Sequence, residues 1–197
     1  MRHLAAALAT LCILAVLRPD HVEPQTPDLV AQGRQALDAD RTDEALAIFE
    51  NAVAADPKNP AALAWLGSAQ VRKAARVPFF ERAGWVKRGF DTLDEAVERF
   101  PDVAVVYVVR GITATRVPDL FRKAGVAVQD LTRVVTMKDG RSGAVPDAVM
   151  PSVYLNLGLA YKKTNQPAAA RAAWEKAKTL YPAAREAAAI DKELKNL

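Results

Sequence analysis

The side chains that most often carry enzymatic chemistry are nearly absent from this sequence. The chain has two histidines, His3 and His21, and its single cysteine is Cys12. Residues 28–197 therefore contain neither an imidazole nor a thiol. For that region this excludes a Ser-His-Asp triad, a cysteine nucleophile, a Cys/His zinc site and Cys-x-x-Cys-His haem attachment. We expect no catalytic residue, no cofactor and no metal ligand there.

Carboxylates are the remaining candidates for acid–base chemistry. Asp91, Asp94 and Glu95 cluster in the sequence, as do Asp43 and Glu44. Acids at the starts and on the outer faces of helices are usually solvated or stabilise the helix dipole. The sequence therefore predicts a protein that is not an enzyme. A carboxylate-dependent hydrolase is the alternative, and it would require a cleft of paired acids.

Basic residues exceed acidic ones, but they are interspersed along the chain. The sequence has 27 Lys and Arg against 23 Asp and Glu, which gives a formal net charge of +4. A nucleic-acid-binding surface would concentrate Lys and Arg beside stacking aromatic residues. We therefore expect no nucleic-acid partner.

The most regular part of the chain is residues 151–182, which reads as two helices and a turn. The first helix places large and small apolar residues on one face, at Tyr154, Leu157, Gly158 and Tyr161. A polar turn ends it before Pro167, because proline lacks a backbone donor and is best tolerated in the first turn of a helix. The second helix has its inner face at Ala170, Trp174 and Ala177, before Pro182 closes the unit.

The order Tyr-x-x-Leu-Gly-x-x-Tyr, then Ala-x-x-x-Trp, then Pro resembles the tetratricopeptide repeat (TPR), a 34-residue helical hairpin. The family's leading Trp is Tyr154 here and its Phe is Trp174, so both large aromatic side chains are kept. A second copy with the same spacing runs from Leu29 to Pro57. An ordinary amphipathic hairpin is the alternative, and the second copy argues against it.

Two longer units lie between these copies. One begins at Leu63-x-x-Leu66-Gly67 and closes at Phe100-Pro101, and the other begins at Tyr107-x-x-Arg110-Gly111. The triplet at residues 76–78, Arg-Val-Pro, recurs at residues 116–118, which indicates duplication of a stretched hairpin.

These patterns predict an all-α fold. We expect a right-handed superhelical stack of about four TPR-like helical hairpins, with the two middle ones elongated. Residues 183–197 are expected to form a C-terminal capping helix, because the last hairpin of a repeat stack otherwise exposes its apolar face. The repeat domain is then residues 28–197.

The resemblance implies a binding groove, because in this family the first helix of each hairpin lines a concave surface that holds a peptide or a partner's helix. Five residues beyond the repeat glycines stand Asp38, Arg72, Arg116 and Lys163. Three of the four are basic, so we hypothesise a row of cations that binds an acidic peptide or a terminal carboxylate. The alternative is that the helix dipole alone favours bases near these helix C-termini.

The same resemblance assigns four further residues to the groove: Ser68, Ile112, Asn156 and Leu159. They give it a mixed, partly apolar floor, in which Asn156 would offer its amide to a ligand backbone.

A second contact site is predicted at Phe79, Phe80 and Trp85. Basic residues frame these rings, at Arg76, Arg82, Lys87 and Arg88. Aromatic rings beside arginines suit lipid headgroups or a partner protein. Alternatively, the three rings cover the core beneath a long loop.

The N-terminal segment reads as a targeting sequence. Met1-Arg2-His3 precedes an apolar run from Leu4 to Leu17. As a helix this run would span about 21 Å, which is short of the roughly 30 Å hydrocarbon core of a bilayer. We therefore predict a signal peptide at residues 1–17, with an uncleaved anchor as the alternative, and a proline-rich linker at residues 18–27.

Together these features predict an exported, periplasmic interaction scaffold or adaptor, which binds a peptide or partner protein in its groove. The alternative is a membrane-tethered assembly or stability factor for an envelope or transport complex, anchored in the inner membrane and facing the periplasm. Membrane contact is expected only through the N-terminal segment, if that segment is uncleaved.

Overall fold

The computed structural model describes residues 28–140 and 145–197. The predicted signal or anchor at residues 1–17 and the predicted linker at residues 18–27 lie outside the described residues. Within the described part, the regular structure consists of nine α-helices and three short 3-10 helices, and it contains no strand. The prediction of an all-α fold is confirmed.

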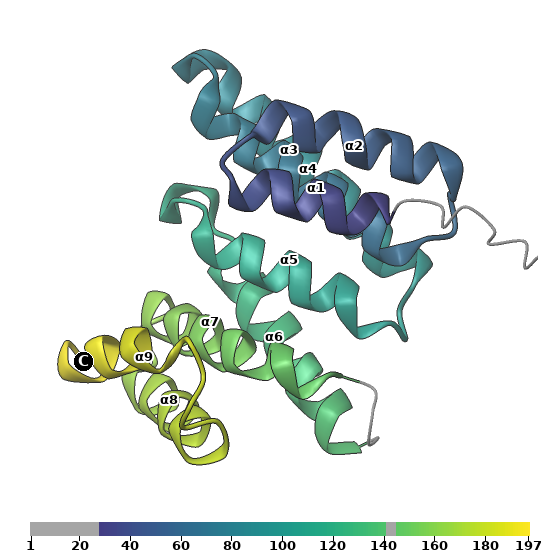
Figure 1. The fold of residues 1–197 in the computed structure, drawn as a ribbon. Coiled ribbons are helices and arrows are strands. Elements are labelled where there is room, and N and C mark those ends of the chain that lie inside the picture. The colour runs from purple at the N-terminus through teal and green to yellow at the C-terminus, as the bar shows by residue number, and fades with distance from the viewer. Residues whose placement is uncertain (1–27, 141–144) are drawn as a thin grey trace, which may run out of the picture.

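Eight of the helices pair into four hairpins, and a ninth follows them (Figure 1). The hairpins are α1 (Leu29–Asp38) with α2 (Thr42–Ala55), α3 (Pro60–Lys73) with α4 (Phe79–Arg99), α5 (Ala104–Arg116) with α6 (Ala124–Gly140), and α7 (Met150–Lys163) with α8 (Pro167–Leu180). The final helix is α9 (Ala187–Lys195). It begins later than residue 183, where the sequence placed it, because the chain turns at residues 182–186.

The two middle hairpins are elongated, as predicted. Helix α4 has 21 residues and α6 has 17, whereas α2 and α8 have 14 each. The repeated Arg-Val-Pro triplet produces the same break in both, since the residue before a proline is driven to an extended conformation. Val77 and Val117 are both extended, with ψ of 160° and 151°. Only the second hairpin re-enters an α-helix directly after its proline.

The first and fourth hairpins share one turn geometry. Asp40 and Asn165 are both left-handed, with φ of 62° and 59°. The next residue in each turn donates its backbone N–H to the preceding helix, Arg41 to the Ala36 carbonyl and Gln166 to the Tyr161 carbonyl, both at 2.8 Å. Aspartate and asparagine tolerate this conformation better than most residues. The two copies recognised in the sequence are therefore alike in backbone detail.

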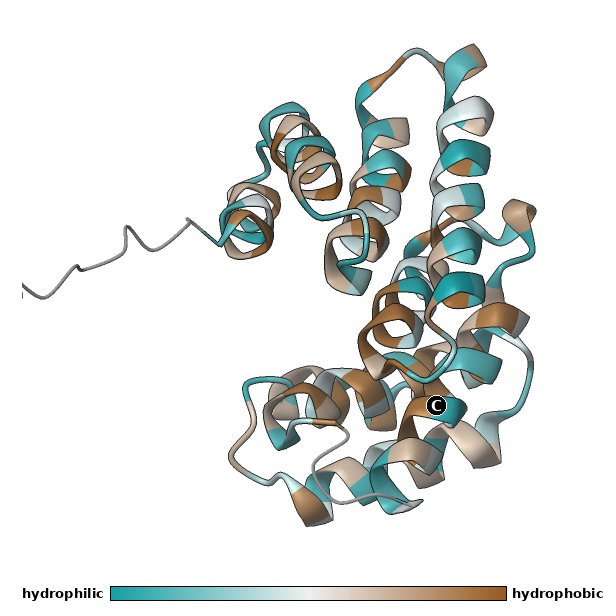
Figure 2. Ribbon diagram, turned by 90° about the vertical axis from the view of Figure 1, so that its right-hand side faces the viewer, coloured by the Kyte–Doolittle hydropathy of each residue, from teal (hydrophilic) through white to brown (hydrophobic). Residues whose placement is uncertain are grey.

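The stack has an inner layer made of the first helices. Helix α1 contacts α3, α3 contacts α5, α5 contacts α7, and α7 contacts α9. Each second helix packs on its own first helix and on the next one along the chain. The first helices of successive hairpins contact each other directly, so they form the inner side of the stack. The stack curves around this inner side (Figure 2).

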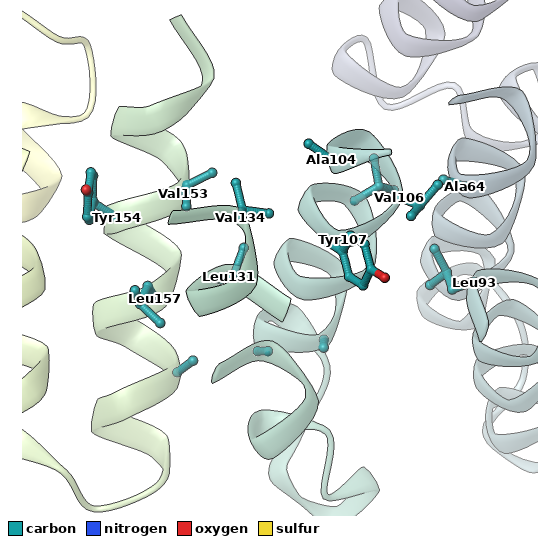
Figure 3. Close-up of a cluster of buried hydrophobic side chains, with 14 of the residues drawn as sticks. Ala64, Leu93, Ala104, Val106, Tyr107, Leu131, Val134, Val153, Tyr154 and Leu157 are labelled. Carbon is teal, nitrogen blue, oxygen red and sulfur yellow. The ribbon is translucent and has the colours of Figure 1, made fainter. Parts of the chain in front are cut away.

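Two apolar clusters hold the stack together. The larger one runs from α3 to α9, and its buried side chains include Leu93, Val106, Leu131 and Val153 (Figure 3). The smaller one is centred on the first hairpin and includes the buried Leu66 and Ala69 of α3, while Trp65 and Trp85 pack against both clusters. Helix α3 therefore contributes to both clusters, since Leu63 and Ala64 lie in the larger one. Among the described residues, no helix combines the length and the hydropathy needed to span a bilayer.

Candidate functional site

The repeat glycines set how closely the two helices of each hairpin approach. A Cβ added at Gly33 would lie 2.5 Å from the Phe49 ring, and one at Gly111 would lie 2.8 Å from Leu131. At Gly158 the added atom would overlap the Trp174 indole. The Trp174 Nε1–H also donates to the Leu155 carbonyl at 3.1 Å. These contacts hold each first helix in place against its second helix. They therefore also position the residues at the C-terminal ends of the first helices.

The predicted row of charged residues lies along those C-terminal ends. Asp38, Arg116 and Lys163 are the last residues of α1, α5 and α7, and Arg72 is the last but one of α3. Because successive first helices are in contact, the row runs from hairpin to hairpin along one edge of the inner layer.

Two of the three cations in the row are used by the fold itself. Arg72 Nη2 donates to the Leu37 carbonyl at 2.9 Å, and Lys163 Nζ donates to the Val117 carbonyl at 3.0 Å. Lys163 also forms an ion pair with Asp119 at 3.0 Å. Each cation thus reaches the C-terminal end of the preceding first helix, where unpaired carbonyls and the helix dipole favour positive charge. For Arg72 and Lys163, this contact accounts for the base at this position.

Arg116 differs from the other two. Its side chain is exposed, and it has no hydrogen bond or ion pair to any other residue of segments 28–140 and 145–197. The pKa of Arg116 is lowered, because the surrounding protein displaces water from the guanidinium and because Arg72 adds a second positive charge; Asp38 opposes this shift. The structure therefore leaves one unsatisfied cation in the row.

The four residues predicted to line the floor of the groove are more buried than the sequence suggested. Ser68 is buried between α3 and α5, where its Oγ accepts from the Thr113 hydroxyl at 2.9 Å. Asn156 is buried and donates to the Ser152 carbonyl of its own helix at 2.8 Å. Both differ from the prediction because first helices pack directly on one another, so these positions face protein. Ile112 and Leu159 are half-buried against the larger cluster.

The second predicted contact site is divided by the structure. Phe79 and Phe80 are 84% and 82% exposed at the start of α4, so they do not cover the core. Trp85 is half-buried and packs against both apolar clusters, with the Arg88 guanidinium 4.7 Å from the ring centroid. The alternative interpretation, in which the rings cover the core, therefore holds for Trp85 alone.

The acidic residues that we considered for catalysis are each paired with a base. Asp91 pairs with Lys87 at 2.7 Å, and Asp94 pairs with Arg110 at 2.8 Å. The remaining pairs are Glu95 with Arg99, Asp43 with Lys73 and Glu44 with Arg41. Within the described residues, no group of three or more His, Cys, Asp or Glu side chains could hold a metal ion.

The sequence reasoning missed a buried ion pair in the third hairpin. Arg110 Nε and Nη2 donate to the two carboxylate oxygens of Asp130, each at 2.7 Å, and Nη1 donates to Asp94 at 2.8 Å. Asp130 is only 1% exposed. A signal was present, because Arg110 precedes a repeat glycine at the position where Leu66 and Leu157 stand in the other hairpins. This pair ties α5 to α6 and to α4.

Two bases on second helices, Arg99 at the end of α4 and Arg133 within α6, also reach carbonyls of the preceding hairpin junction. Arg99 Nη2 donates to the Pro57 carbonyl at 2.5 Å, and Arg133 Nη2 donates to the Pro101 carbonyl at 2.9 Å. Much of the basic excess of the chain is thus used between hairpins.

Comparison with known proteins agrees with this architecture. Residues 36–75 and residues 151–183 each match a family model described as Tetratricopeptide repeat. A crystal structure of a thermophilic TPR protein of Thermus thermophilus is similar with a TM-score of 0.72 and 19% identity, over 89% of this chain and 84% of that one. MamA of AMB-1 is similar with a TM-score of 0.55 and 22% identity, over 79% and 78%. These structural likenesses show the fold alone, and among curated proteins no sequence matches.

Proposed function

Because this chain is a tetratricopeptide-repeat protein, with a fold that generally serves as a protein interaction scaffold, we propose that it is a non-catalytic adaptor for an acidic segment of a partner. The segment binds along the inner layer of first helices, at the edge where α3, α5 and α7 end. It presents a carboxylate, from a side chain or from a chain terminus, to Arg116.

The state of Arg116 carries this proposal. A guanidinium pairs best with a carboxylate through two parallel hydrogen bonds. Arg116 has no such partner within the described residues, and Arg72 beside it adds positive charge. A bound carboxylate would offset both charges. Ile112 and Leu159 lie four residues before Arg116 and Lys163, hence beside them on the same helix faces, so an apolar contact next to each base supports a peptide ligand.

The test is co-purification from the native host with three full-length baits. The intact protein is the first, Arg116→Glu is the second, and Arg171→Glu is the matched control, because Arg171 is an exposed arginine on α8, outside the row. A partner that is retained by the intact protein and by Arg171→Glu but lost by Arg116→Glu supports the proposal. Equal retention by all three overturns it. Arg72 and Lys163 are left unchanged, since their contacts belong to the stack.

We further propose that this adaptor is exported to the periplasm, with the apolar run from Leu4 to Leu17 acting as a cleaved signal peptide. The membrane-tethered assembly factor is the competing proposal. N-terminal sequencing of the protein from its native host separates them. A processed N-terminus in the soluble fraction supports export, whereas an intact Met1 in the membrane fraction supports the tethered form.

A further inference from the structure

One end of the second hairpin stands clear of the rest of the stack (Figures 1 and 2). We call residues 79–84 the α4 tip. All six of its residues are exposed, and a Cβ added at Gly84 would meet nothing within 4 Å. The first residues of α4 that face the apolar clusters are Trp85 and Val86. The α4 tip therefore extends α4 beyond the part of the helix that packs against the core.

The α4 tip carries two adjacent phenylalanines, at 84% and 82% exposure. The other large apolar side chains that are exposed among the described residues stand singly, at Val103, Leu120 and Leu180. A single exposed apolar residue needs no explanation, but a contiguous apolar projection marks a contact surface. Among the described residues, Phe79 and Phe80 are thus the strongest candidate for a contact surface.

Positive charge surrounds the two rings. Arg76 pairs with Asp40, and Lys87 pairs with Asp91 at 2.7 Å. Arg82 donates only to the Val77 carbonyl, at 3.3 Å, and Arg88 stacks on Trp85. Glu81 is the one acid within the α4 tip. Among the described residues, Arg82 and Arg88 therefore have no carboxylate partner, and the surface that receives the α4 tip should supply negative charge.

We propose that the α4 tip docks on an anionic lipid bilayer. Phe79 and Phe80 enter the interface between headgroups and acyl chains, and Arg82, about 3–4.5 Å further along the helix, contacts lipid phosphates. The α4 tip is a convex projection that is exposed on all sides. A bilayer can deform around such a projection, whereas a protein partner would need a matching pocket. This contact is separate from Arg116 and is additional to any contact made by the N-terminal segment.

A tryptophan reporter in the full-length protein tests the proposal. Phe80→Trp places the reporter in the α4 tip. Leu180→Trp is the matched control, because Leu180 is a 52% exposed apolar residue on α8. Each variant is mixed with vesicles of phosphatidylcholine alone, or of equal amounts of phosphatidylcholine and phosphatidylglycerol. The expected result is a blue shift of the emission, with quenching by brominated acyl chains, for Phe80→Trp on the anionic vesicles only.

Comparing the two full-length variants removes the contributions of the N-terminal run and of the three native tryptophans, which are common to both. An equal response of Leu180→Trp, or none from Phe80→Trp on anionic vesicles, overturns the proposal. A blue shift that grows with protein concentration without vesicles assigns the α4 tip to a second copy of the chain instead. Adding Arg82→Glu and Arg88→Glu to Phe80→Trp should abolish the vesicle response, and an unchanged response contradicts the role of charge. Arg116→Glu should leave the response intact.

Discussion

The second and fourth hairpins use the same glycine position in two different ways. In the fourth, Gly158 makes room for the Trp174 ring, whose Nε1–H is bonded to the opposite helix. In the second, Gly67 faces the backbone of Gly89, and each glycine would place a Cβ under 3 Å from the other's carbonyl oxygen. The inserted Trp174 ring fixes the position of α8 along the axis of α7. Two facing glycines bring the backbones of α3 and α4 close together.

The two hairpins also differ in how much of each is matched by the repeat models. The matched segment at residues 151–183 covers the fourth hairpin except for Met150, whereas α4 lies outside both matched segments. The fourth hairpin is thus a structural unit of fixed length. The second hairpin keeps the packing of that unit at Phe90 and Leu93 and adds a projection at the other end of α4.

The largest expected effect is on the fourth hairpin. Trp174→Ala should lower the free energy of unfolding by about 3–5 kcal/mol, because a fully buried ring and its hydrogen bond are removed. Urea denaturation followed by circular dichroism measures this. Phe80→Ala is the control in the second hairpin, and it should leave the midpoint nearly unchanged. Similar losses in both variants would contradict the distinction between the two hairpins.

The third hairpin has the ion pair Arg110–Asp130 at the positions where the fourth hairpin has Leu157 and Ala173. Substitutions there test whether an apolar pair can replace the charged one. Asp130→Ala should cost about 3 kcal/mol, because Arg110 is only 13% exposed and loses two of its three carboxylate bonds. Adding Arg110→Leu gives the third hairpin the residues found at Leu157 and Ala173. The double variant should recover most of the loss in thermal denaturation. A further loss would show that Arg110 is needed for packing apart from its charge.

Replacing glycine by alanine is expected to change stability in opposite directions at two positions of the second hairpin. Gly67→Ala should destabilise by about 1–3 kcal/mol, because the added Cβ meets the Gly89 carbonyl, which is backbone and cannot turn aside. Gly84→Ala should stabilise by up to about 1 kcal/mol, since it gains helix propensity in open space. Midpoints of urea unfolding for the two variants decide this. A gain at Gly67 would mean that the two helices can separate at no cost.

The smallest expected effect is at the α4 tip. Phe79→Ser combined with Phe80→Ser should change the free energy of unfolding by less than about 0.5 kcal/mol, as for other exposed positions. The far-ultraviolet circular dichroism spectrum and the thermal midpoint provide the measurement. A cooperative loss of helix signal would instead give these rings a role in the core.

The fold was predictable where local pattern and packing agree. A glycine, an aromatic residue and a proline at fixed spacing identify the first and fourth hairpins, and the structure places Gly33 against Phe49 and Gly158 against Trp174. In the elongated second hairpin, helical periodicity continues up to the predicted close at Phe100-Pro101, and Phe90 and Leu93 on that stretch are buried. Phe79 and Phe80 precede that periodic segment, so their exposure could not be read from spacing.

The candidate site was less predictable, because its properties depend on contacts between hairpins. Arg72 and Arg116 occupy equivalent positions in the sequence, yet Arg72 reaches the Leu37 carbonyl and Arg116 reaches no acceptor within the described residues. Ser68 follows a repeat glycine, and only the spacing of α3 and α5 decides that it is buried against Thr113. Such distances are set by the whole stack rather than by any one repeat.

The division of the apolar core at α3 gives the first hairpin a separate opening equilibrium. Residues 29–55 contribute to the smaller cluster, which shares Val53, Trp65 and Trp85 with the larger one, so their local unfolding would leave most of the larger cluster in place. Such an opening would remove Asp38, the carboxylate that offsets Arg116, and would release Arg72 from the Leu37 carbonyl. The opened form would leave Arg72, Arg76 and Arg116 without these partners and would bind anions more tightly. By reciprocity, a bound anion would favour the opening, which couples ligand affinity to the stability of the N-terminal hairpin.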